Sequence, residues 1–211
     1  ELAHKLEPER PEPMIQLKNI YLVDLKDDAK AEQILLQLLT KDPDKLEYLM
    51  ELGSFYYNKQ NYAEAVKYFE KARPLIPTNI DNLMNISACY YEMKDYAKAM
   101  DATKAALEIE PNNIDILDNA RSIAAQIQDI DQAIIYLKRK LEIRPEEEDF
   151  SMLATYLYNK QDWQELIKYA EEWYNFDKSN KIAVEYVIWA AQQSGNKQVE
   201  TKYAAIKKTL P

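Results

Sequence analysis

Residues 61–77 read NYAEAVKYFEKARPLIP, a stretch in which apolar residues at helical spacing run from a polar turn to a proline. This pattern predicts one amphipathic helix that ends near the proline. Two residue types recur with the same step of 34 residues, namely Ala31, Ala65, Ala99 and Ala133, and Pro43, Pro77, Pro111 and Pro145. A fixed period between about 20 and 50 residues is the signature of a repeat protein, so the stretch is predicted to be one unit of an array.

The repeats are predicted to be pairs of antiparallel helices, because each contains two apolar stripes joined by a short polar turn. Asn or Asp in these turns can cap the second helix of each pair. The chain has only two glycines in 211 residues, which also favours an all-helical fold. The predicted helices span residues 14–25 and 29–41, 46–59 and 62–73, 80–93 and 96–109, 114–127 and 130–143, 147–159 and 163–176, and 181–194 and 197–209.

Small residues are expected where the two helices of a pair cross, because only a small side chain allows close approach. Ala65, Ala99 and Ala133 are predicted to lie at these crossings on the second helices. Gly53 and Ser87 are the matching small residues on the first helices.

Together these residues resemble the signature of the tetratricopeptide repeat (TPR) family. The second repeat carries Leu49, Leu52-Gly53, Tyr56, Ala65, Phe69, Ala72 and Pro77, and the third carries Leu83, Ile86-Ser87, Tyr90, Ala99, Ala106 and Pro111. The resemblance implies an α-solenoid of about six helix pairs forming a right-handed superhelix. First helices would line its concave side and second helices its convex side.

The predicted domain organisation is a Pro-rich, charged tether over residues 1–13 followed by a single TPR-like array over residues 14–211. The only histidine, His4, lies in the tether and is expected to be solvated. The predicted repeats span about residues 12–45, 46–79, 80–113, 114–146, 147–180 and 181–211.

Three basic residues depart from the repeat pattern. Lys18 stands where the first repeat should carry an apolar residue, so its opening helix is expected to be divergent. Arg121 and Lys140 occupy small-residue positions of the fourth repeat. Either their stems pack while the charged heads reach water, or they mark a local widening or hinge. We favour the first interpretation, because such snorkelling needs no change in the backbone.

Composition excludes several kinds of chemistry. With one histidine and one cysteine, neither a His/Cys metal site nor a Cys-His or Ser-His catalytic set is supported, and two glycines leave no phosphate loop. No catalytic residue, cofactor or metal is therefore expected. Cys89 is predicted to be a buried small hydrophobe. The net charge of −9 disfavours nucleic acid as a partner, and no apolar run in this segment is long enough for membrane insertion.

Binding is the remaining prediction, and the face of each first helix turned away from its partner forms the candidate groove. This face carries acids, tyrosines and methionines but no Lys or Arg, so the expected partner is a neutral to basic protein or peptide. The predicted groove residues are Glu47, Met50, Glu51, Ser54, Tyr57, Asn58, Asp81, Met84, Asn85, Ala88, Tyr91, Glu92, Asp115, Asp118, Asn119, Ser122, Met152, Thr155, Tyr158 and Trp189.

Two features of this groove carry specific hypotheses. Asn85 and Asn119 are one repeat apart, and either they bond a peptide backbone as a ladder, as in some TPR relatives, or they satisfy neighbouring helices. TPR relatives that clamp the C-terminal carboxylate of chaperones use Lys, Arg and Asn from successive first helices, and only the two Asn are present here. Tyr91 is favoured as a groove anchor, because Tyr90 beside it can fill the core position.

The leading functional prediction is a non-enzymatic interaction scaffold or adaptor that binds an extended or helical peptide. One alternative is a regulatory or targeting arm of a larger protein. The location would be cytoplasmic, or periplasmic or membrane-tethered if a signal or anchor precedes Glu1. A second alternative is a self-associating scaffold or homo-oligomer. That alternative rests on apolar residues at the two ends of the array: Ile15, Leu17, Ile20 and Val23, and Ile182, Tyr186 and Trp189.

Overall fold

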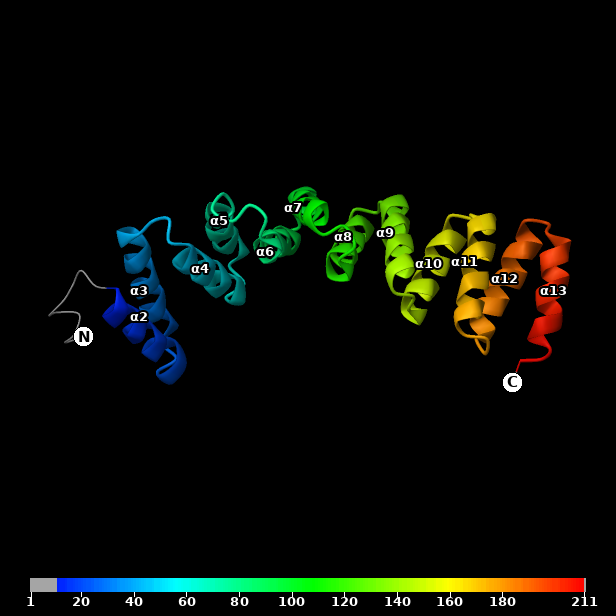
Figure 1. Ribbon diagram of the computed structural model, residues 1–211, viewed down its shortest axis with the longest axis horizontal. Helices are drawn as coiled ribbons and strands as arrows, with labels where there is room; N and C mark the ends of the chain where they lie inside the picture. Colours follow the sequence, from blue (N-terminus) through cyan, green and yellow to red (C-terminus); the bar gives the residue numbers. More distant parts are fainter. Residues whose placement is uncertain (1–10, 211) are drawn as a thin grey trace. The chain divides into compact units, whose positions relative to one another are not determined.

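The computed structural model describes residues 11–210, and this part of the chain is helical, without a strand. The predicted all-α succession of helix pairs is confirmed, and each predicted end lies within about two residues of an observed one. The elements are α2 (Glu12–Asn19), the π-helix η1 (Ile20–Asp24), α3 (Asp28–Lys41), α4 (Leu46–Asn58), α5 (Tyr62–Ala72), α6 (Ile80–Glu92), α7 (Tyr96–Ile109), α8 (Ile114–Gln126), α9 (Ile130–Ile143), α10 (Glu147–Asn159), α11 (Trp163–Phe176), α12 (Lys181–Gln193) and α13 (Lys197–Lys207) (Figure 1).

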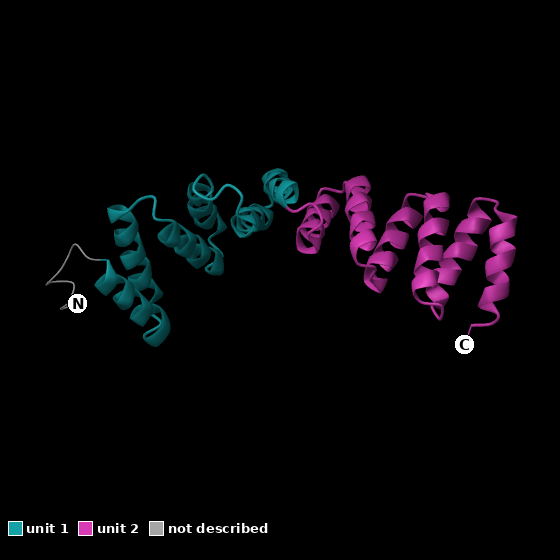
Figure 2. Cartoon of the chain, in the orientation of Figure 1, with its two compact units in different colours: residues 1–109 teal, residues 110–211 magenta. Residues whose placement is uncertain are grey.

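The chain divides into two compact units, residues 1–109 and residues 110–211, each described here by itself (Figure 2). Helices α2 to α7 belong to unit 1 and α8 to α13 to unit 2. The single array predicted for residues 14–211 stays a prediction. Most of the predicted tether, with His4, lies outside the described residues, and α2 begins at Glu12 instead of the predicted Met14.

Short polar turns join the two helices of a pair. Asn61 and Asp129 cap α5 and α9, because each side chain accepts a hydrogen bond from the backbone N–H three residues later, at 3.4 and 3.1 Å. The preceding residues, Gln60 and Gln128, have left-handed φ angles of 59° and 60°. The left-handed residue reverses the direction of the chain, and the capping residue directly after it begins the second helix. The paired helices are therefore antiparallel neighbours.

The predicted small-residue crossings are confirmed. Ala65, Ala99 and Ala133 have no exposed surface. A Cβ atom built at Gly53 would lie 2.5 Å from Cε1 of Phe69, so the Phe69 ring fills the space that a side chain at position 53 would need. The absence of a side chain on α4 therefore lets α5 carry a large one.

In the third repeat, two small polar residues lie at the corresponding crossing. Ser87 on α6 is fully buried, and its Oγ lies 2.7 Å from Oγ1 of Thr103 on α7. Thr103 also donates to the backbone carbonyl of Ala99 at 2.9 Å. These hydrogen bonds satisfy hydroxyl groups that would otherwise be costly to bury.

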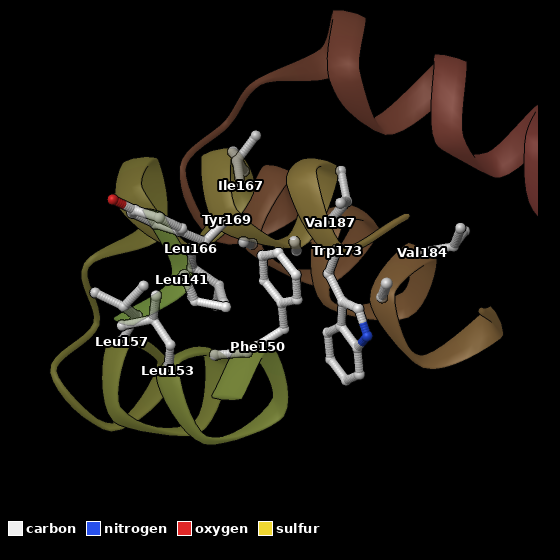
Figure 3. Close-up of a cluster of buried hydrophobic side chains, with 14 of the residues drawn as sticks. Leu141, Phe150, Leu153, Leu157, Leu166, Ile167, Tyr169, Trp173, Val184 and Val187 are labelled. Atoms are coloured by element: carbon white, nitrogen blue, oxygen red, sulfur yellow. The ribbon is translucent and has the colours of Figure 1, made fainter. Parts of the chain in front are cut away.

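The core of unit 2 extends from α9 to α13 and is rich in aromatic residues. Phe150 of α10 and Trp173 of α11 lie side by side in it, with ring centroids 6.5 Å apart and planes 6° from parallel (Figure 3). Leu153 and Leu157 continue the buried face of α10. This packing joins neighbouring helix pairs as well as the two helices within a pair.

The first repeat is divergent, as predicted. Lys18 is only 3% exposed, and its Nζ donates to both carboxylate oxygens of Glu51 on α4, at 2.6 and 2.7 Å. The following η1 segment buries Tyr21 but leaves Val23 71% and Leu25 61% exposed. The basic residue at an apolar position is thus explained by a carboxylate that reaches it from the next repeat.

For Lys140, the prediction that the charged head reaches water is wrong. Lys140 is 7% exposed, and its Nζ lies 2.8 Å from Oδ2 of Asp118 on α8 and 3.0 Å from Oδ1 of Asp149 on α10. The ammonium group therefore joins three helices of unit 2. Arg121 keeps a half-buried side chain, with Nε 3.5 Å from Oδ1 of Asp118.

Burial and pairing act against each other in this cluster. Burial alone would lower the pKa of Lys140, but the hydrogen bonds and charges of Asp118 and Asp149 raise it above its ordinary value. Burial raises the pKa of Asp149, and the contact with Lys140 offsets only part of that rise. The ammonium group between the two carboxylates therefore stays charged, while burial favours the protonated form of Asp149.

Candidate functional site: the first-helix faces

The predicted groove residues all lie on the first helices of the pairs, α4, α6, α8, α10 and α12. Each of them is half-buried or exposed, and none belongs to the buried core. This exposure is what a solvent-facing side of a helix requires. Their common role in binding a peptide stays a prediction.

In unit 1, four predicted residues meet at one hollow. Met50, Glu51, Ser54 and Asn58 of α4 border a space of about 380 Å³. Leu22, Leu35 and Phe55 complete its wall. Phe55 lies on α4 itself, whereas Leu22 of η1 and Leu35 of α3 are apolar residues that spacing along α4 alone did not indicate.

The acids of these faces are less free than the sequence suggested. Glu51 is bound by Lys18, as described above. Asp118 is bound by Lys140, and Glu185 of α12 lies 2.8 Å from the Nζ of Lys207 on α13. The predicted first-helix faces carry no Lys or Arg themselves, but lysines of neighbouring helices form ion pairs with their carboxylates.

The groove tyrosines of unit 1 have a packing partner. Tyr57 at the end of α4 meets Tyr62 at the start of α5 edge to face, with centroids 5.3 Å apart and planes at 67°. Tyr91 and Tyr96 repeat this contact in the next pair, at 5.4 Å and 66°. Burial raises the pKa of Tyr57. These rings therefore stabilise the turn within a pair, and a role for Tyr91 as an anchor stays a prediction.

The two asparagines of the proposed ladder are both half-buried. Asn85 lies on α6 in unit 1, and Asn119 lies on α8 in unit 2. Both interpretations of the pair, a ladder that bonds a peptide backbone and hydrogen bonds to neighbouring helices, stay predictions.

Unit 2 carries the most aromatic part of these faces. Tyr158 of α10 and Trp189 of α12 have ring centroids 4.3 Å apart and planes tilted by 32°. Trp163 of α11 meets Trp189 edge to face at 4.9 Å and 80°. Tyr186 meets Tyr158 at 6.4 Å and 77°. Residues from three helices thus form one aromatic cluster, in which Tyr158, Tyr186 and Trp189 come from first helices and Trp163 begins a second helix.

Two hollows lie on α10 and α12, and the first of them borders this cluster. The first, of about 330 Å³, is lined by Tyr158, Ile182, Glu185, Tyr186 and Trp189. The second, of about 640 Å³, shares Ile182 and contains two predicted groove residues. Its lining is Glu147, Glu148, Ser151, Met152, Thr155, Tyr156, Trp173 and Ile182. The aromatic density of residues 156–189 was the sequence signal for this site.

Among the residues that the structure describes, no group of three or more His, Cys, Asp or Glu side chains is placed to hold a metal ion. No helix among residues 11–210 combines the length and apolar character that crossing a membrane requires. Cys89 is fully buried, as predicted, and burial raises the pKa of its thiol to about 12.

Comparison with solved structures identifies the class of fold. The C-terminal part of a TPR repeat-containing protein from Cytophaga hutchinsonii is 22% identical with a TM-score of 0.67, over 84% of this chain and 73% of that one. A tetratricopeptide repeat protein from Parabacteroides merdae is 19% identical with a TM-score of 0.63, over 93% and 77%. YrrB, described as a TPR protein with an unusual peptide-binding site, is 14% identical with a TM-score of 0.56, over 82% and 90%.

These likenesses confirm the predicted resemblance: the chain has the helical-repeat fold of the TPR proteins. At the level of sequence, the family model described as Regulator of microtubule dynamics protein 1-3 matches residues 58–129, less than half of the 211 residues. None of the curated proteins compared with the chain matches it.

Proposed function

We propose that the chain is a non-enzymatic interaction scaffold that binds an extended or helical segment of another protein along its first-helix faces. The fold supports an interaction module, since its structural relatives are TPR proteins. The observation that carries the proposal is the pair of hollows on α10 and α12 that share Ile182, where aromatic, methionine and acidic side chains line the walls. Aromatic and methionine side chains are favoured anchors at protein interfaces.

The large aromatic and apolar side chains of unit 2 differ in exposure. Trp173 of α11 is 1% exposed and Tyr203 of α13 is 3% exposed, so their rings serve the core. By contrast, Tyr158 of α10 is 40% exposed and Ile182 of α12 is 55% exposed. An accessible apolar patch rimmed by polar residues is typical of an interaction site.

Site-specific photocrosslinking tests this assignment. A photoreactive benzoylphenylalanine replaces Asn58, Glu92 or Thr155 on first helices, and Lys104 or Lys168 on second helices as controls. All five positions are exposed, so each substitution leaves the core intact. We expect partner adducts at the first-helix positions only. Equal adducts at the controls, or adducts only there, would refute the proposal.

Self-association is a second candidate, which one observation favours. Ile20, Val23 and Leu25 of the first repeat are 43%, 71% and 61% exposed, and together they form an apolar surface on η1 and the turn after it. Sedimentation analysis of the wild type and of a Val23→Asp, Leu25→Asp variant tests it. A dimer that the variant loses would support self-association, and a monomer at high concentration would exclude it.

A further inference from the structure

We propose that the hollow bordered by Tyr158, Glu185 and Trp189 binds the guanidinium group of an arginine in an extended partner segment. This inference rests on the proposed function, to which it adds the chemistry of the partner. It follows from the ring geometry, from the charge of the lining residues and from an ion pair already present at the rim.

The ring geometry provides a flat, accessible surface. Tyr158 and Trp189 lie too close together, at 4.3 Å, for any group to enter between them. A ligand must therefore lie against the outer face of this layered pair, and Tyr158 is 40% exposed. Tyr186 meets Tyr158 with ring planes at 77° and also lines the hollow. Trp163 meets both rings of the pair at steep angles, with its centroid 6.3 Å from that of Tyr158 and 4.9 Å from that of Trp189.

The charge of the lining residues selects a cation. Glu185 lines the first hollow, and Glu147 and Glu148 line the second, with which the first shares Ile182. Neither hollow has Lys or Arg among its described lining residues. Rings attract cations over their faces, and the attraction strengthens when a carboxylate lies beside them.

An ion pair at the rim shows that Glu185 already attracts a cation. Its Oε1 lies 2.8 Å from the Nζ of Lys207, and both side chains are about half exposed, at 55% and 49%. An exposed pair of this kind contributes little stability, so an incoming group can displace it. A guanidinium group can stack on Tyr158 and donate hydrogen bonds to Glu185 at the same time, which a rounded ammonium group cannot do as well.

The test compares two peptide libraries against the full chain. Acetylated, amidated peptides carry a central arginine among random residues other than Lys and Arg, and a matched library carries citrulline, the neutral isostere, at the same place. For the tightest arginine peptides, we expect the citrulline version to bind about 5- to 30-fold more weakly. Equal affinity for the two peptides would overturn the proposal.

Variants of the chain locate the effect. Glu185→Gln is expected to weaken the arginine peptides and leave the citrulline peptides unchanged. Tyr158→Ala is expected to weaken the arginine peptides more than the citrulline peptides, whereas Lys207→Met is expected to strengthen the arginine peptides by freeing Glu185. Tyr174→Ala is the matched control, because Tyr174 makes a comparable edge contact with Tyr203 at 5.9 Å on second helices. Circular dichroism verifies that each variant is folded.

The outcomes separate this inference from the proposed function. Peptides that bind but ignore arginine, Glu185 and Tyr158 would overturn the arginine site and leave the scaffold function standing. Failure of any peptide, including those of an unrestricted random library, to bind would count against both. A dimer of the free chain that Glu185→Gln abolishes would assign the hollow to a second copy and overturn the proposal of a separate partner.

Discussion

Replacement of Lys140 by methionine is expected to destabilise unit 2 strongly at neutral pH. The substitution keeps the length and apolar stem of the side chain but removes both ion pairs of the ammonium group, at 2.8 and 3.0 Å. Asp149 then remains buried, with a side chain 5% exposed and an Oδ2 that has no hydrogen-bond partner even in the wild type. Asp118, whose side chain is 36% exposed, can be hydrated instead.

The expected loss is about 3–5 kcal/mol, the cost of leaving one buried charge without its partner. Nearly all of it comes from Asp149, since the more exposed Asp118 contributes no more than about 1 kcal/mol. The assay is urea denaturation followed by far-UV circular dichroism. Lys160→Met is the control, because the Lys160–Asp131 ion pair is exposed, at 39% and 72%, and its loss should cost less than about 1 kcal/mol.

The loss should also depend on pH. Burial raises the pKa of Asp149, and removal of Lys140 takes away the contact that lowers it, so the folded-state pKa rises further above its ordinary value. A raised folded-state pKa means that the protonated form favours the native state. Stability is therefore lost as pH increases through that pKa and is regained on acidification toward about pH 4.

A second substitution tests the assignment to Asp149. Asp149→Asn in the Lys140→Met background should recover part of the loss at neutral pH and flatten its pH dependence. Asparagine is compatible with this place in the repeat, since Asn82 occupies the corresponding position of the third repeat and donates to the Phe69 carbonyl at 3.1 Å. A loss of stability in Lys140→Met no larger than in Lys160→Met, or a loss that Asp149→Asn does not reduce, would contradict this role of Lys140.

Three further substitutions test the packing. Ala99→Leu should overpack a crossing with no exposed surface and lower the free energy of unfolding by about 1–3 kcal/mol; an unchanged melting temperature would contradict the placement. Gly53→Ala should cost about 1 kcal/mol despite the better helix propensity of alanine, because its Cβ would lie 2.5 Å from Phe69, and a gain in thermal stability would contradict this. Asn180→Ala should cost about 1–2 kcal/mol in urea denaturation, because its side chain caps α12 at 2.8 Å and donates to Glu147 at 3.0 Å; a loss below about 0.5 kcal/mol would contradict the role of this cap.

The helices and their crossings could be predicted because they are repeated. Ala65 and Ala99 occupy the same place in successive pairs, and helical spacing alone determines which side of each helix is apolar. Caps such as Asn61 could likewise be predicted from the sequence, because a polar turn residue before an apolar stripe has few other roles. Periodicity therefore predicts whatever is local or repeated.

Contacts that depend on a particular neighbour could not be predicted in this way. The partners of Lys140 lie on two other helices. The sequence around Lys140 shows only that a long aliphatic side chain with a charged end occupies this position. For the same reason the cations that reach Glu51 and Glu185 were missed, as was the stacking of Tyr158 on Trp189. The groove was predicted one helix at a time, but its charge and shape depend on adjacent helices.

A crystal structure of the chain with a selected arginine peptide would show where the peptide binds. We expect the peptide to lie on the first-helix faces of α10 and α12, with its guanidinium group against the Tyr158 ring and hydrogen-bonded to Glu185. A peptide bound instead to the second helices α11 and α13, with the hollow beside Tyr158 unfilled, would contradict it.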